Sequence, residues 1–107
     1  MKTYSESQPG AMKKDFEAEV MQWPQIRQKR IYGHPCYQAG GKLFALVVPG
    51  GVVVTRLSQA DTAELLARPG NARFKEEGWV RMAVETPADL QQALAAVRRS
   101  YERALAE

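Results

Sequence analysis

Cysteine and histidine are scarce in this sequence, with one of each among 107 residues. A lone Cys36 can form no disulfide within the chain, which removes one mark of secreted domains. Zinc sites take three or four Cys, His or carboxylate ligands, so His34 and Cys36 alone predict no metal site unless a second chain contributes. No cofactor is expected, because the sequence contains no phosphate-binding loop, dinucleotide motif or serine elbow.

Long apolar runs are also absent. The longest run, residues 43–48, is far shorter than the roughly 20 residues that cross a membrane. The polar residues 1–10 lack the apolar stretch of a signal peptide and are expected to form a flexible N-terminal tail. We therefore expect a cytoplasmic protein with no membrane partner and a single domain over residues 11–107, a length that builds one core.

The first helical signal follows the polar start. Apolar residues recur there at every fourth position: Met12, Phe16 and Val20. Pro24 disfavours helical backbone at Trp23, so this helix is expected to end near Gln22.

Three strand segments follow, joined by short links that contain glycine. They cover residues 29–38, 42–48 and 52–57. Gly33 and Pro35 interrupt the first segment, which predicts an edge strand or a bulged strand. Links this short force neighbouring strands to run antiparallel, because a parallel return needs a long crossover.

Two helix starts are recognisable in the second half. Ser58 precedes an acidic residue at the third helical position, and Thr86 is followed by Pro87 at the first. The first helix should end at residues 69–70. The second carries an apolar stripe: Leu90, Leu94, Val97, Tyr101 and Leu105.

Extended segments near residues 73–74 and 79–84 separate these two helices. The expected fold class is α+β, with an antiparallel sheet of four to five strands, helices on one face, and the order α-β-β-β-α-β-(β)-α.

Acidic residues are missing from the three-strand region. No Asp or Glu lies between Glu19 and Asp61, although the chain has 12 acidic residues and a net charge of +3. The same interval holds five basic residues: Arg27, Lys29, Arg30, Lys42 and Arg56. Basic side chains beside aromatic ones on a sheet can hold a phosphate backbone. We take Arg30, Lys42 and Arg56 as a candidate anion or nucleic-acid surface; the alternative is that strands disfavour Asp and Glu anyway.

His34 and Cys36 raise the alternative of a thiol nucleophile beside a base. They point to the same face of an extended strand, but residues two apart lie roughly 6–7 Å from each other, beyond the hydrogen-bond reach of a thiol. We predict ordinary structural roles for both residues and no enzyme activity.

Two turn-and-strand motifs stand close together in the sequence. Residues 31–37 are Ile-Tyr-Gly-His-Pro-Cys-Tyr, and residues 40–46 are Gly-Gly-Lys-Leu-Phe-Ala-Leu. The pattern is carried by Tyr32, Gly33, His34, Pro35, Tyr37, Gly41, Lys42 and Phe44. This hairpin resembles that of the TfoX N-terminal domain family, which is related to MmcQ/YjbR-like proteins, and the resemblance extends over about residues 12–106.

The resemblance implies a fold similar to the type III secretion chaperone-like, YjbR-like fold. TfoX proteins regulate natural competence, and MmcQ/YjbR-like proteins are often described as DNA-binding. No catalytic residues define either group, so none is carried over to this chain. The separate C-terminal domain of the full-length regulators is absent from this sequence, which separates the chain from their competence role.

Two functions follow as expectations. The first is a non-enzymatic interaction or regulatory domain that binds a protein partner or forms a homodimer, because a sheet covered on one face leaves its other face available. The alternative is a nucleic-acid-binding accessory protein in transcription regulation that uses the basic sheet surface.

Overall fold

The structure, a computed structural model, describes residues 10–107, in which three helices and six strands are found. The helices are α1 (Gly10–Val20), α2 (Gln59–Leu66) and α3 (Pro87–Ala106). The strands are β1 (Ile26–Ile31), β2 (His34–Ala39), β3 (Lys42–Val48), β4 (Gly51–Val54), β5 (Ala72–Arg73) and β6 (Val80–Ala83). The predicted N-terminal tail lies outside the described residues except for Gly10, where α1 begins.

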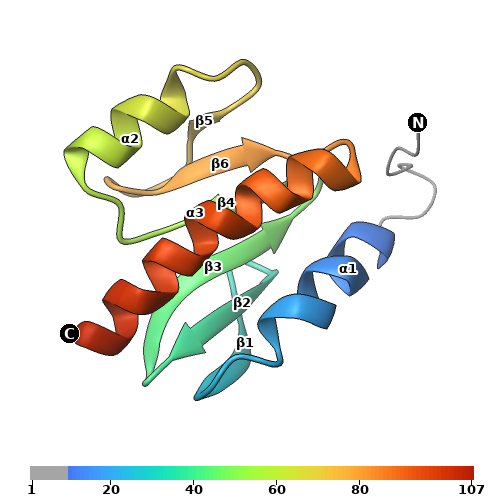
Figure 1. Cartoon of the computed structure of the whole chain (residues 1–107), viewed down its shortest axis with the longest axis vertical. Helices are drawn as coiled ribbons and strands as arrows, with labels where there is room; N and C mark the ends of the chain where they lie inside the picture. The colour runs from blue at the N-terminus through green and yellow to red at the C-terminus, as the bar shows by residue number, and fades with distance from the viewer. Residues whose placement is uncertain (1–9) are drawn as a thin grey trace.

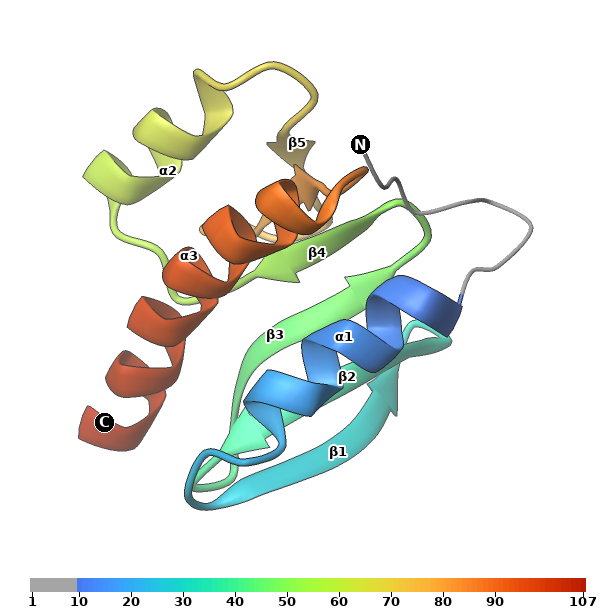
Figure 2. The ribbon, with the colours of Figure 1, turned by 45° about the vertical axis from the view of Figure 1, so that its right-hand side comes forward.

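The six strands form one sheet in the order β1-β2-β3-β4-β6-β5, and every neighbouring pair is antiparallel. Figures 1 and 2 show α1 and α3 lying across the same face of this sheet. The predicted α+β class is therefore confirmed. None of the helices within residues 10–107 is both long enough and apolar enough to cross a membrane.

The prediction of four to five strands was wrong for the first hairpin. The single interrupted strand predicted over residues 29–38 is in fact the pair β1 and β2, and it starts three residues earlier than expected, at Ile26. Tyr32 and Gly33 form the two-residue turn between them, both with positive φ (52° and 77°), as a type I′ turn requires. A tyrosine in that conformation is uncommon, so the turn gives a weak sequence signal.

The main core lies between the sheet and the helices. It combines the apolar stripes of α1 and α3 with the inner side chains of five strands and Leu65 of α2. Four of the five predicted α3 stripe residues are buried: Leu90, Leu94, Val97 and Tyr101. Leu105 is 38% exposed instead, because the last turn of α3 lies over the β2–β3 turn, where Gly40 offers no side chain to cover it.

The predicted helix starts are both confirmed. Ser58 Oγ accepts a hydrogen bond from the backbone N–H of Asp61 at 3.0 Å and caps α2. Thr86 and Asp89 form a complete capping box at the start of α3, with Pro87 as its first residue.

The second face of the sheet carries a smaller core, so its centre is not left available, contrary to the expectation from the sequence. Cys36, Leu46, Val48 and Val53 are buried there, packed against Ile31, Leu43, Phe74 and Trp79. The segment 74–79, which we call the strap, supplies the last two of these side chains. Its Phe74 ring lies 6.2 Å from the His34 ring, and its Trp79 ring lies 6.4 Å from Tyr32. The chain thus covers the centre of this face itself.

Candidate functional site

Strand β1 is the long exposed edge of the sheet. Among the described strands only β2 pairs with it, and the opposite edge, β5, has only two residues. Ile26 and Ile31 are half-buried at its ends, and the four residues between them are exposed. An edge strand carries a row of backbone N–H and C=O groups that no neighbouring strand satisfies. Among the described strands, β1 therefore presents the longer row of unpaired backbone groups.

The basic side chains of β1 divide between the two faces of the sheet. Gln28 lies on the helix side, where its Nε2 donates a hydrogen bond to Glu17 Oε2 at 2.6 Å. Because successive side chains of a strand alternate, Arg27 and Lys29 both project from the opposite face. Arg30 is on the helix side again. We call Arg27, Lys29 and Arg30 the basic edge.

A hollow of about 620 Å³ lies beside Arg27 and Lys29. Its lining consists of Gln25, Ile26, Arg27, Lys29, Gln38, Gly40 and Gly41. The turn glycines help to keep it open, since a Cβ added at Gly41 would meet no atom within 4 Å. The lining has two cations and two amide side chains but no carboxylate, so its chemistry suits a negatively charged group.

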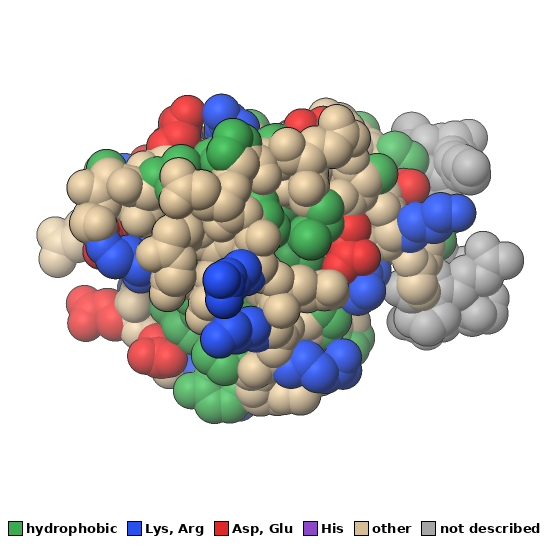
Figure 3. All heavy atoms as spheres, turned by 90° about the horizontal axis from the view of Figure 1, so that it is seen from below, with side chains coloured by type: hydrophobic (Ala, Val, Ile, Leu, Met, Phe, Trp, Pro, Cys, Tyr) green, Lys and Arg blue, Asp and Glu red, His purple; other side chains and the backbone are tan. Residues whose placement is uncertain are grey.

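Most arginines of the described chain are neutralised, but those of the basic edge are not. Six basic side chains form ion pairs with carboxylates: Lys13, Arg56, Arg68, Arg98, Arg99 and Arg103. Within residues 10–107, Arg27, Lys29 and Arg30 form no such pair. Figure 3, which looks onto the β1 side, shows Lys and Arg side chains gathered in the middle and lower part of the face, with an acidic patch beside them and further Asp and Glu side chains nearer the margins.

Two of the three predicted surface residues, Arg30 and Lys42, lie apart. Arg30 is exposed, and its Nη2 donates to Gly33 O at 3.1 Å beside the β1–β2 turn. Lys42 is half-buried at the start of β3. Arg30 pairs with Pro35 and Lys42 pairs with Ala39, so four residues of β2, about 13 Å, separate them.

The third residue, Arg56, is engaged by the fold. Its backbone has a positive φ of 54°, and its Nε donates to Leu43 O at 2.7 Å. Its Nη1 forms an ion pair of 2.6 Å with Glu107, at the end of the last helix. Lys42 and Arg56 lie at the same end of the sheet, but Arg56 is already neutralised.

Sequence reasoning placed Arg27 and Lys29 in the acid-free region without selecting them. The signal that selects them is their spacing of two within a strand, which puts both side chains on one face. The predicted strand began at Lys29 and left Arg27 outside, so this relationship was missed.

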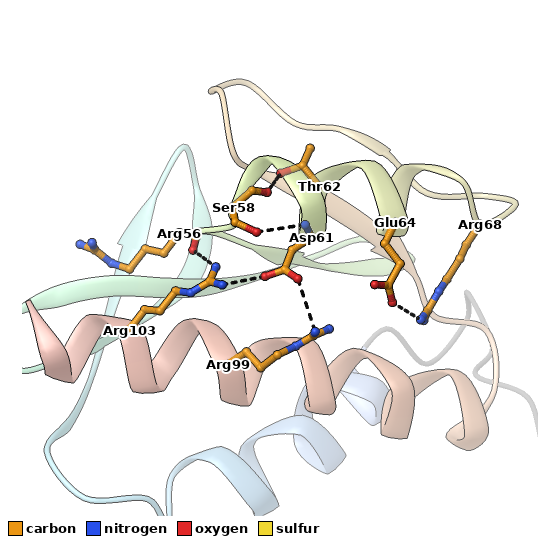
Figure 4. Close-up of polar contacts among 8 residues, drawn as sticks. All are labelled: Arg56, Ser58, Asp61, Thr62, Glu64, Arg68, Arg99 and Arg103. Carbon is orange, nitrogen blue, oxygen red and sulfur yellow. Dashed lines mark hydrogen bonds and ion pairs between the residues drawn. The ribbon is translucent and has the colours of Figure 1, made fainter.

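A second charged cluster joins α2 to α3 and is structural (Figure 4). Asp61 accepts Arg103 Nη2 at 2.8 Å and Arg99 Nη1 at 3.5 Å, while Arg103 Nη1 donates to Arg56 O at 2.8 Å. Burial alone would raise the pKa of Asp61, but the Arg103 hydrogen bond and the Arg99 charge outweigh it and hold that pKa below its usual value. Arg99 and Arg103 therefore belong to the fold.

Cys36 and His34 share a face of β2, as predicted, but the surroundings of Cys36 do not favour a nucleophile. The Cys36 thiol is 1% exposed, and burial raises its pKa. The His34 ring packs edge-on against Phe74 of the strap. Within residues 10–107, no group of three His, Cys, Asp or Glu side chains is placed to hold a metal ion.

The remaining hairpin residues make internal contacts. The Tyr37 hydroxyl donates to Glu17 Oε2 at 2.6 Å. The pKa of Tyr37 is raised mainly by its burial and, to a smaller extent, by the nearby Glu17 carboxylate. Phe44 packs edge-on against Tyr101 at 5.4 Å. Lys75 of the strap lies 4.7 Å from the Tyr32 ring. These contacts hold the hairpin strands against α1, α3 and the strap.

No family model matches the chain, and comparisons with curated proteins and with solved structures find no significant match. The resemblance to the TfoX N-terminal domain family stays a prediction, and the function has to be argued from the geometry of the basic edge.

Proposed function

We propose that this chain is a non-enzymatic interaction domain that binds an acidic region of a protein partner through the basic edge. One observation carries the proposal: Arg27 and Lys29 project from the same face of an exposed edge strand, beside an open hollow, with no carboxylate paired to either in residues 10–107. Unpaired cations on an accessible edge steer and hold an oppositely charged partner.

The surroundings of Cys36 support a non-enzymatic role. A thiol acts as a nucleophile only as its thiolate, and a buried thiol with a raised pKa supplies little of it near neutral pH. The geometry also favours a partner over self-association through β1. Two copies of β1 paired antiparallel would bring basic side chains opposite one another, and like charges facing each other across a sheet are unfavourable.

The proposal is tested by binding of a fluorescent ten-residue polyglutamate peptide to the purified chain at low ionic strength. We expect the double variant Arg27→Glu, Lys29→Glu to weaken binding by about tenfold or more, because attraction becomes repulsion. The matched control is Arg73→Glu, which reverses an exposed charge on the opposite edge and should change affinity by less than about twofold. Equal losses in both variants, or no binding at all, would refute the proposal.

A nucleic acid is the second candidate partner, and the same unpaired cations favour it. In that case a single-stranded oligonucleotide should bind more tightly than polyglutamate, with an affinity that falls steeply with added salt. The predicted surface of Arg30, Lys42 and Arg56 gives a further test. Lys42→Ala should weaken oligonucleotide binding more than Arg56→Ala, since Arg56 already pairs with Glu107.

A further inference from the structure

The register of the β1–β2 hairpin fixes which backbone groups of β1 are free. Ile31 and His34 close the type I′ turn at Tyr32 and Gly33, and the residue pair that closes such a turn exchanges both of its backbone hydrogen bonds. Hydrogen-bonded and non-hydrogen-bonded pairs then alternate along the ladder. The N–H and C=O groups of Arg27, Lys29 and Ile31 point to β2.

The alternate residues of β1 therefore turn their backbone groups outward. Gln28 and Arg30 each offer one N–H and one C=O to an incoming strand, and Ile26 continues the row. The hydrogen bond from Gly40 N to Gln25 O, at 3.4 Å, agrees with this alternation at the other end of the hairpin. A six-residue strand with a free row of this kind spans about 20 Å.

The side chains of β1 determine which types of residue an added strand should have opposite them. Residues opposite Arg27 and Lys29 would project over the same face as these cations, towards the hollow, and both would lie in non-hydrogen-bonded pairs, where side chains are closest. The residue between them would project to the helix side, near the Glu17 carboxylate that Gln28 contacts. Acidic residues therefore fit at alternate positions, with an uncharged residue between them.

We infer that the acidic partner region binds as an extended strand, antiparallel to β1, with acidic residues two apart opposite Arg27 and Lys29. The inference rests on the proposed function and specifies how the partner is held. All strand pairs of this sheet are antiparallel, and antiparallel pairing is slightly the more stable per residue. The occupant is thus a segment of another protein, held by backbone hydrogen bonds and by charge.

The test compares eight-residue peptides of equal composition on the full chain. One peptide alternates Glu with Thr, and the other holds its Glu residues in one block. The alternating peptide should bind about tenfold more tightly, because half of the block's carboxylates would face the helix side, where Glu17 lies and the Arg30 guanidinium is already hydrogen-bonded to Gly33 O. Equal affinities of the two peptides would overturn the strand geometry while leaving the proposed function intact.

N-methylated versions of the alternating peptide test the backbone bonds separately. Methyl groups on the Thr nitrogens, which would face β1, should weaken binding about tenfold, whereas methyl groups on the Glu nitrogens, which would face away, should weaken it less than about twofold. Equal effects of the two methylation patterns, or an oligonucleotide that outcompetes both unmodified peptides, would overturn the inference. Failure of polyglutamate and both unmodified peptides to bind would instead refute the proposed function.

Discussion

The hydroxyl group of Tyr37 in β2 lies 2.6 Å from Glu17 Oε2 in α1, and Gln28 of β1 donates to the same oxygen at 2.6 Å. One carboxylate thus ties the first helix to two strands, one of which carries the basic edge. Lys13 contacts the other oxygen of Glu17 at 3.2 Å. The position of β1 depends on a small polar cluster at the boundary between α1 and the sheet.

Removal of the Tyr37 hydroxyl should weaken this connection. Tyr37→Phe keeps the buried ring and loses one hydrogen bond to a charged group, so we expect a loss of about 1–2 kcal/mol in the free energy of unfolding. For a domain of this size, thermal unfolding should show a fall in Tm of about 4–8 °C per kcal/mol. Tyr32→Phe is the control, because that ring is 55% exposed, and its change should stay within about 0.5 kcal/mol. A fully stable Tyr37→Phe variant would contradict the role given to Glu17.

Asp61 should make stability depend on pH in the acidic range. Its pKa is lower in the folded chain than in the unfolded chain, so its contribution is fully present above the unfolded pKa of about 3.9 and is lost as the pH falls through the folded pKa. Asp61→Asn should lower the free energy of unfolding by about 1 kcal/mol near neutral pH, and should remove part of its decrease below pH 4. Chemical denaturation at several pH values measures this.

Glu64→Gln provides the matched control for Asp61. Glu64 lies on the same helix and pairs with Arg68 at 3.4 Å, but both of these side chains are well exposed. Exposed pairs contribute little, so this variant should follow the original pH dependence closely. The same acid dependence in the chain and in Asp61→Asn would show that the α2–α3 cluster does not control it.

The strap should control access to Cys36. In the intact chain a maleimide should react slowly with this buried thiol. Trp79→Ala removes a ring that packs on the smaller core, and the reaction should become about tenfold faster if local opening costs roughly 1.4 kcal/mol less. Trp79→Phe, which keeps an aromatic ring, should stay close to the original rate.

Tyr37→Phe serves as a second control for the thiol reaction. It weakens the fold at α1 and leaves the strap intact, so it should accelerate the reaction less than Trp79→Ala. Equal acceleration in the two variants would mean that Cys36 becomes reachable only through global unfolding, and the strap would then not act as a local cover.

The sequence predicted those parts of the fold that local chemistry determines. The caps at Ser58 and Thr86 depend on neighbouring residues and were predicted correctly, as was the apolar stripe of α3 as far as Tyr101. The β1–β2 turn was hidden because a tyrosine such as Tyr32 rarely adopts a positive φ. The short strand β5 was expected near residues 73–74, one residue late, since two residues are too few to show a periodicity. The packing of Phe74 and Trp79 on the second face joins segments far apart in the chain, which no local pattern reveals.

The candidate surface was predicted only as a region. The acid-free interval pointed to the hairpin strands, but the choice of residues within them needed the strand register. Arg56 could not be excluded from the sequence, since its partner Glu107 lies at the other end of the chain. Arg27 and Lys29 could be joined only once β1 was known to begin at Ile26.

The most direct measurement is a map of backbone amide chemical shifts in the ¹⁵N-labelled chain as unlabelled alternating Glu-Thr peptide is added. The largest changes are expected at residues 26–31, with smaller ones at the neighbouring Gln38 and Gly41 that line the hollow. They should weaken at high salt, because the charges are exposed. Changes centred on α1 or α3, or on the Asp61 cluster, would contradict the claim that β1 is the binding edge.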